Sequence, residues 1–141
     1  FLKKQPTVDN AKIAAIGYCF GGGVVLNMAR QGLNIKGVVS FHGSLAAVKR
    51  AVPGSVKTKI LVLNGEADTF VTAQHIKDFK KEMREAGADY KFINYPGAIH
   101  AFTNSGATAL GKKFNIKIAY HPEADKKSWE EMKQFFKVIF G

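Results

Sequence analysis

The sequence predicts an α/β fold, a mainly parallel sheet with helices on its flanks. Short apolar runs alternate with amphipathic stretches along the chain, and this alternation of strands and helices is typical of parallel sheets. The apolar runs are also nearly continuous, as expected for strands covered on both faces. We expect one domain over residues 1–141, with about four strands.

Four apolar segments are predicted to be strands, and each ends at a residue pattern that breaks a strand. They cover residues 12–18, 36–41, 59–64 and 89–95. The first runs into a glycine-rich turn, the third is followed by Gly65, and the fourth is halted by Pro96-Gly97. Residues 43–57 carry Pro53-Gly54 and are predicted to form a loop.

Three amphipathic stretches are predicted to be helices. The first opens at Gly21 and stops near Gly32, and the second has Thr72 as a plausible N-cap and ends at Gly87. The third follows His121-Pro122 and carries apolar residues every three or four positions. Its stripe, which we expect to face the core, consists of Trp129, Met132, Phe135, Phe136 and Ile139.

Composition excludes several classes of protein. With 46% hydrophobic residues the chain can bury a core, but no apolar run reaches the roughly 18 residues of a membrane span. The segment Phe1–Pro6 lacks the apolar region of a signal peptide, and no initiator Met is present. We therefore expect the chain to start partway through a longer protein. The single cysteine excludes an intrachain disulfide, argues against a structural zinc site and fits the reducing cytoplasm.

The formal net charge of +10 is spread along the chain in short basic pairs. This pattern favours a solvated basic surface, and steering of anionic substrates is the alternative. No basic-aromatic motif accompanies the charge, so we expect no nucleic-acid partner.

The turn after the first strand carries a motif for nucleophilic catalysis. It reads Gly17-Tyr18-Cys19-Phe20-Gly21, a nucleophile elbow with Cys in the usual Ser position. Glycines two residues to either side leave room for the helix to pack near the strand. The thiol would then lie at a helix N-terminus, where positive partial charge favours the reactive thiolate. The backbone N–H of Phe20 would point to where an oxyanion forms.

Glycine-rich turns after a strand also occur in other motifs. A dinucleotide-binding fingerprint needs a different glycine spacing, and a phosphate-binding loop needs a Gly-Lys-Ser/Thr sequence, which this turn lacks. A buried, purely structural cysteine is the third alternative, because cysteine often behaves as a small hydrophobic residue.

A thiol nucleophile needs a base, and the base needs an orienting acid. Asp68 lies in the loop after the third strand and is preferred to Glu66 because it is deeper in that loop. His100 lies beyond the carboxyl end of the fourth strand. His42 is interpreted as a packing or loop residue. We expect the two remaining histidines, His75 and His121, to be solvated.

At these motifs the chain resembles the dienelactone hydrolase family of the α/β-hydrolase fold. The resemblance implies that residues 1–141 are a partial domain, the C-terminal half of that fold. The resemblance rests on residues 16–23, 64–68 and 95–102. It implies Cys19 as the nucleophile, His100 as the general base and acid, and Asp68 as the orienting residue. The implied reaction is hydrolysis of an ester or lactone through an acyl-cysteine, with no cofactor and no metal.

The chain departs from the family pattern in two ways. The nucleophile strand is normally preceded by further strands, which would supply a second oxyanion donor and an acidic residue near the thiol. Members that act on dienelactone also tend to carry Ser and Arg at the positions of Ala101 and Asn104. We therefore expect a small-molecule ester or lactone as the substrate, of unspecified kind.

Two alternative functions follow from the same features. A four-stranded sheet would expose an apolar edge through which a non-catalytic module could associate, including as a homo-oligomer. Cys19 could instead act as a redox sensor, although the chain has no second cysteine to resolve it.

Overall fold

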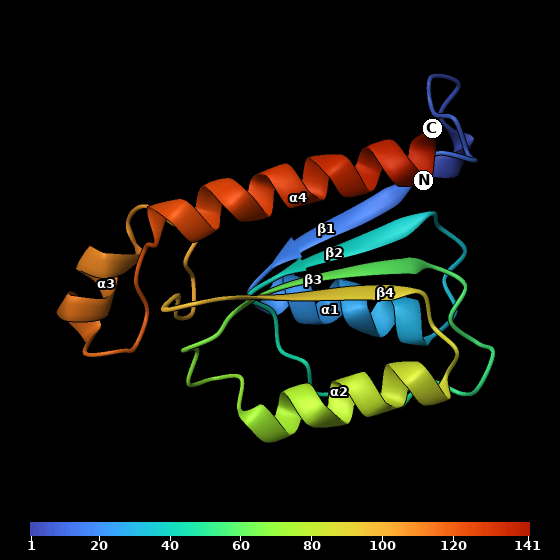
Figure 1. Cartoon of the computed structure of the whole chain (residues 1–141). Coiled ribbons are helices and arrows are strands. Elements are labelled where there is room, and N and C mark those ends of the chain that lie inside the picture. The colour runs from blue at the N-terminus through green and yellow to red at the C-terminus, as the bar shows by residue number, and fades with distance from the viewer.

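Four parallel strands form the centre of the protein, which is described here over residues 1–141 by a computed structural model. The strands are β1 (Ala14–Tyr18), β2 (Gly37–Phe41), β3 (Lys59–Gly65) and β4 (Tyr90–Tyr95). They are arranged in chain order, β1-β2-β3-β4, and every pairing is parallel. The predicted α/β fold is thus confirmed, and all four strands point their carboxyl ends to the same edge (Figure 1).

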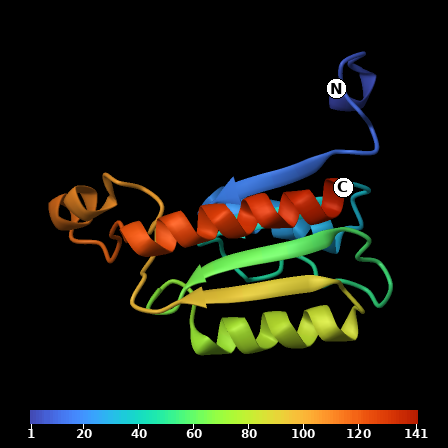
Figure 2. The ribbon, with the colours of Figure 1, turned by 45° about the horizontal axis from the view of Figure 1, so that its top comes forward.

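Helices cover both faces of this sheet. Helices α1 (Phe20–Arg30) and α2 (Ala73–Glu85) lie on one face, and α4 (Pro122–Phe140) crosses the other (Figures 1 and 2). The apolar core is accordingly split in two: Val38 and Ile60 pack toward α1 and α2, whereas Val39 and Leu61 pack toward α4. None of the helices has both the length and the apolar character needed to cross a membrane.

Two of the helices begin with side-chain caps. The predicted N-cap Thr72 is confirmed, because its hydroxyl accepts a hydrogen bond from the N–H of His75, whose ring accepts one from the N–H of Thr72. His121 was expected to be solvated but instead caps α4, with Nδ1 accepting a hydrogen bond from the N–H of Ala124 at 3.2 Å. Both caps satisfy N–H groups that have no partner within the helix.

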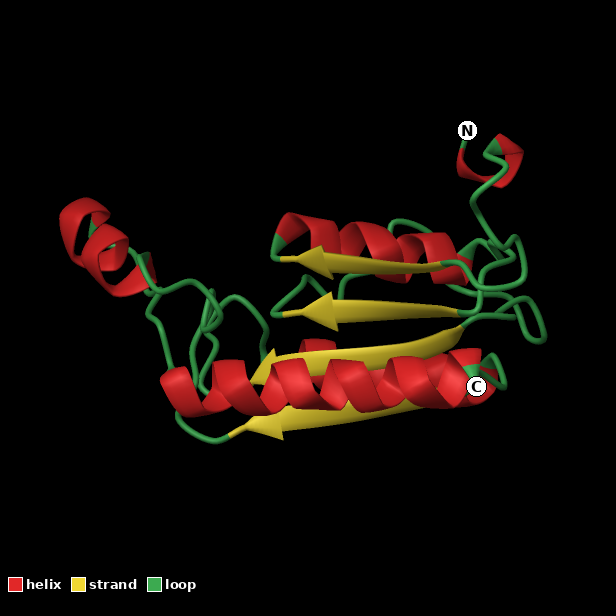
Figure 3. Ribbon diagram, turned by 90° about the horizontal axis from the view of Figure 1, so that it is seen from above, coloured by secondary structure: helices red, strands yellow, loops and turns green.

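The structure also contains elements that the sequence pattern did not indicate. Helix α3 (Ala107–Phe114) lies beyond the carboxyl ends of the strands, apart from the sheet (Figure 3), and a short 3-10 helix, η1, covers Leu2–Lys4. The expected stripe of α4 is only partly confirmed. Met132 and Ile139 are buried in the core, but Trp129 is 47% exposed and faces the carboxyl-end side of the sheet.

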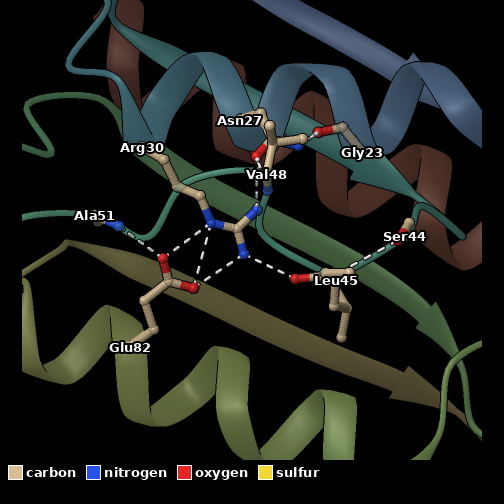
Figure 4. Close-up of polar contacts among 9 residues, drawn as sticks. Gly23, Asn27, Arg30, Ser44, Leu45, Val48, Ala51 and Glu82 are labelled. Atoms are coloured by element: carbon tan, nitrogen blue, oxygen red, sulfur yellow. Dashed lines mark hydrogen bonds and ion pairs between the residues drawn. The ribbon is translucent and has the colours of Figure 1, made fainter.

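A buried ion pair joins α1 to α2. The Arg30 guanidinium donates to both carboxylate oxygens of Glu82, at 3.0 to 3.3 Å, and to the carbonyl of Leu45 at 2.8 Å. Glu82 also accepts the N–H of Ala51 at 2.8 Å, so the pair holds the loop between β2 and β3 (Figure 4). Asn27 Oδ1 accepts a further hydrogen bond from the N–H of Val48 in the same loop.

Candidate active site

Cys19 occupies the sharp turn between β1 and α1. Its backbone angles, φ 53° and ψ −117°, lie in a region that non-glycine residues rarely adopt. Its N–H donates to the carbonyl of Phe41 at 3.0 Å, which fixes the turn against β2. The cysteine is exposed, so it is not the buried structural residue of the alternative interpretation.

The two glycines that flank the elbow have different roles. A Cβ on Gly17 would lie 2.1 Å from the carbonyl oxygen of Gly21, because the helix passes directly over the strand end. A Cβ on Gly21 would meet nothing within 4 Å. Gly17 therefore makes the room for the close strand–helix approach. The sequence predicted that both glycines are needed for this close approach, and that prediction is wrong for Gly21.

The structure brings the three predicted side chains, Cys19, Asp68 and His100, into one hydrogen-bonded line. His100 Nε2 lies 3.1 Å from Cys19 Sγ, and His100 Nδ1 lies 2.9 Å from Asp68 Oδ2. These residues follow β1, β3 and β4, whose carboxyl ends meet at one edge of the sheet. This is the order and geometry of nucleophile, base and orienting acid.

Asp68 is held in place from both sides. Its side chain is fully buried, and Oδ1 accepts the N–H of Phe70 at 2.8 Å while Oδ2 is directed to His100. The loops after β3 and β4 are joined by a hydrogen bond from Ala67 N–H to the carbonyl of Ala98 at 3.0 Å. Glu66, the alternative acid in the sequence, is exposed, and the carboxylate that bonds His100 Nδ1 is that of Asp68.

The carboxylate of Asp68 also sets the electrostatics of the imidazole. Its hydrogen bond raises the pKa of His100 above the ordinary value of 6.5, against the opposing effect of burial. A smaller raising contribution comes from the hydrogen bond to Cys19. The imidazole is therefore a stronger base than an isolated histidine, and it is suited to take a proton from the thiol.

His42 lies beside the candidate base, a position that its sequence context did not indicate. It is buried directly after β2, as expected for a packing residue, and its ring meets those of His100 and Phe102 edge-on. Its Nε2 lies 2.8 Å from Thr103 Oγ1. Burial lowers its pKa to about 4, so its ring is neutral at neutral pH. Only the tertiary arrangement of β2 and β4 reveals this contact.

Cys19 and His100 open into a cleft of about 1090 Å³ at the carboxyl edge of the sheet. Three of the four non-glycine residues with positive φ, namely Cys19, His42 and Ala101, line it. Such strained backbone conformations persist only where the surrounding structure holds them, and they cluster at active sites and ligand-binding positions. The strain and the cleft together mark this edge as the candidate active site.

The first residue of α1, Phe20, follows Cys19 directly and is the candidate oxyanion donor. Its N–H belongs to the first turn of the helix, where backbone donors have no partner inside the helix. A donor beside a candidate nucleophile is suited to bind an oxyanion. The chain holds no cluster of three or more His, Cys, Asp or Glu side chains arranged to bind a metal ion.

Comparison with known proteins agrees with this geometry. The family model described as "Dienelactone hydrolase family" matches residues 1–140. The chain belongs to the dienelactone hydrolase family. A dienelactone hydrolase-like promiscuous phosphotriesterase, P91, from metagenomic libraries has a similar structure, with a TM-score of 0.90 and 35% identity. That comparison covers 99% of this chain and 57% of P91.

The relatives of this chain within the dienelactone hydrolase family differ in length. An uncharacterised protein, K02A2.1, of Caenorhabditis elegans is 33% identical over 99% of this chain and 88% of its own length. A putative carboxymethylenebutenolidase of Yersinia pestis is 29% identical over 91% of this chain but only 47% of its own length. The chain thus spans about half of the bacterial relative and most of the nematode one.

Proposed function

We propose that this chain hydrolyses an ester or lactone through an acyl-cysteine intermediate on Cys19. The observation that carries the proposal is the continuous line from Cys19 Sγ through His100 to Asp68, with contacts of 3.1 and 2.9 Å. Membership of the dienelactone hydrolase family supports it. No cofactor enters the proposed reaction.

In the first half-reaction His100 Nε2 takes the thiol proton, and the sulfur attacks the ester carbonyl carbon. A C–S bond forms, and the carbonyl electron pair moves to the oxygen, where the N–H of Phe20 stabilises the negative charge. The pair then returns, the C–O bond to the alcohol breaks, and His100 Nε2 gives its proton to the departing alkoxide. Asp68 accepts the Nδ1–H throughout and stabilises the imidazolium.

In the second half-reaction a water molecule attacks the acyl-cysteine. His100 takes a proton from the water, and a new C–O bond forms at the carbonyl carbon. The C–S bond then breaks, the sulfur leaves with its electron pair, and His100 returns the proton to it. The products are a carboxylic acid and the free thiol.

Hydrolysis of p-nitrophenyl acetate by the wild type and by Cys19→Ala tests the proposal. We expect turnover by the wild type and none above background by the variant. Acid quenching during turnover, followed by mass spectrometry, should find one acetyl group on the peptide that contains Cys19. Equal turnover by both proteins would refute the assignment, provided that thermal unfolding shows both to be folded.

The outer edge of β1 supports a second candidate function. This strand pairs with β2 alone, and Ile16 and Tyr18 on it are exposed. An unpaired edge can accept a strand from another chain, so a binding module that associates there is the alternative. A folded, stable oligomer that lacks ester turnover would favour this function over the hydrolase.

A further inference from the structure

We propose that the cleft selects esters with an uncharged, apolar group, and that Asp125 rejects substrates that carry a carboxylate. The inference rests on the proposed hydrolase function and deepens it by naming the substrate class. Its two supports are the apolar wall of the cleft and the sign of the charge within it.

The wall of the cleft gathers large apolar side chains that are not buried. Phe20 is 82% exposed, Phe70 55%, Trp129 47% and Ile116 45%, and all four line the cleft together with Tyr18. They come from four separate segments of the chain, so their meeting at one opening is a product of the fold. Contiguous exposed apolar surface of this kind marks a binding site for an apolar group.

The charge of the cleft is opposite to that of the chain. Of the 21 Lys and Arg residues, none lines the cleft, whereas the carboxylate of Asp125 does. Ala101 and Asn104 also line the cleft and add no charge. A substrate carboxylate would therefore meet a negative charge and no cation.

Asp125 is fixed at the cleft. It lies in the first turn of α4, where a negative charge is favourable, and it accepts a hydrogen bond from Tyr120 Oη at 3.1 Å. Burial, and after it the charge of Asp125, raises the pKa of Tyr18, which lines the same cleft. A negative charge in the wall of the cleft opposes the binding of a substrate carboxylate.

A pair of esters that differ at one end tests the inference. The p-nitrophenyl ester of hexanoic acid ends in a methyl group, and the p-nitrophenyl monoester of adipic acid ends in a carboxylate. Rates are corrected for spontaneous hydrolysis. We expect the wild type to favour hexanoate by about tenfold or more in kcat/KM, and Asp125→Asn to reduce this ratio severalfold.

Glu123→Gln is the matched control. Glu123 lies in the same first turn of α4, is exposed, pairs with Lys127 and is outside the cleft. The substitution Glu123→Gln removes the same charge from the same helix as Asp125→Asn. We expect it to leave the ratio of kcat/KM for the two esters as in the wild type. Trp129→Ala should reduce the preference for hexanoate over acetate, because it removes part of the apolar wall.

The outcomes separate this inference from the proposed function. No Cys19-dependent turnover of either ester would overturn both. Turnover of both esters with equal efficiency, or a ratio that Asp125→Asn and Glu123→Gln change alike, would overturn the substrate class alone. If Asp125→Asn does not fold, the wild-type ratio at about 1 M salt decides, since screening should reduce it if charge causes it.

Discussion

The imidazole of His42 meets that of His100 edge-on, with 5.3 Å between the ring centroids. His42 is anchored by Thr103 at 2.8 Å and packs against Phe102 on its other side. Because burial keeps it neutral, it supports the ring of His100 without placing a second positive charge beside it. His42 is thus suited to position the candidate base, His100.

Replacement of His42 by Gln should alter the pH dependence of stability. The pKa of His42 is about 4 in the folded protein and about 6.5 when unfolded. The unfolded state therefore binds the proton first as the pH falls, and stability is lost from about pH 6.5 down to about pH 4, by at most about 3 kcal/mol. Urea unfolding at about pH 7 and about pH 4.5 should show a smaller acid loss for His42→Gln. An unchanged loss would contradict the assignment.

Replacement of Asp68 by Asn should lower the pKa of His100. The hydrogen bond to Asp68 is the largest cause that raises this pKa, so its weakening moves the pKa down. Titration of the His100 ring protons by NMR measures the change directly. Glu66→Gln is the control on the same loop, and it should leave the titration in place because Glu66 is exposed and the hydrogen bonds of the ring go to Asp68 and Cys19.

Gly17→Ala and Gly21→Ala should have different effects on the free energy of unfolding, although both glycines belong to the same motif. The added methyl group on Gly17 would overlap the Gly21 carbonyl, and we expect it to lower the free energy of unfolding by about 3 kcal/mol or more. On Gly21 it meets open space at the start of α1, so stability should stay level or rise by up to about 1 kcal/mol. Chemical denaturation of the two variants measures both. Equal losses would show that the backbone turn, and not the close contact, is the constraint.

Replacement of Glu82 by Gln should strongly lower the free energy of unfolding. It leaves the buried Arg30 without its counter-charge, and we expect a loss of about 3 to 5 kcal/mol in the free energy of unfolding. The double variant Arg30→Met with Glu82→Leu should recover part of this loss. Glu85→Gln makes the same chemical change at an exposed pair with Lys81, 3.7 Å apart, and should cost less than about 1 kcal/mol. Similar losses at both sites would argue that the ion pair does not hold the two helices.

The elements that the sequence predicted are those with local signals. Strands β2 and β3 are continuous apolar runs, and the elbow at Cys19 has glycine spacing that few other turns share. Asp68 and His100 could be selected because each follows a strand whose carboxyl end lies at the same edge of a parallel sheet.

The features that the sequence did not predict depend on tertiary contacts. Helix α3 is short, is followed by Asn115 in a left-handed conformation, and lies apart from the sheet (Figure 3). His42 becomes part of the site only because β2 lies beside β3 and β4 beyond it. Trp129 fits the core stripe by periodicity, but it lies on the first turns of α4, which extend past the sheet to the cleft.

The order of the strands gives the sulfur of Cys19 a use as a reporter. Its hydrogen-bond partner His100 is 81 residues away in the chain, so the thiol has its native surroundings only when all four strands are in register. The rate of its alkylation, followed during denaturation, would therefore report cooperative assembly of the whole sheet. With one cysteine in the chain, that signal would come from a single atom without any engineered label.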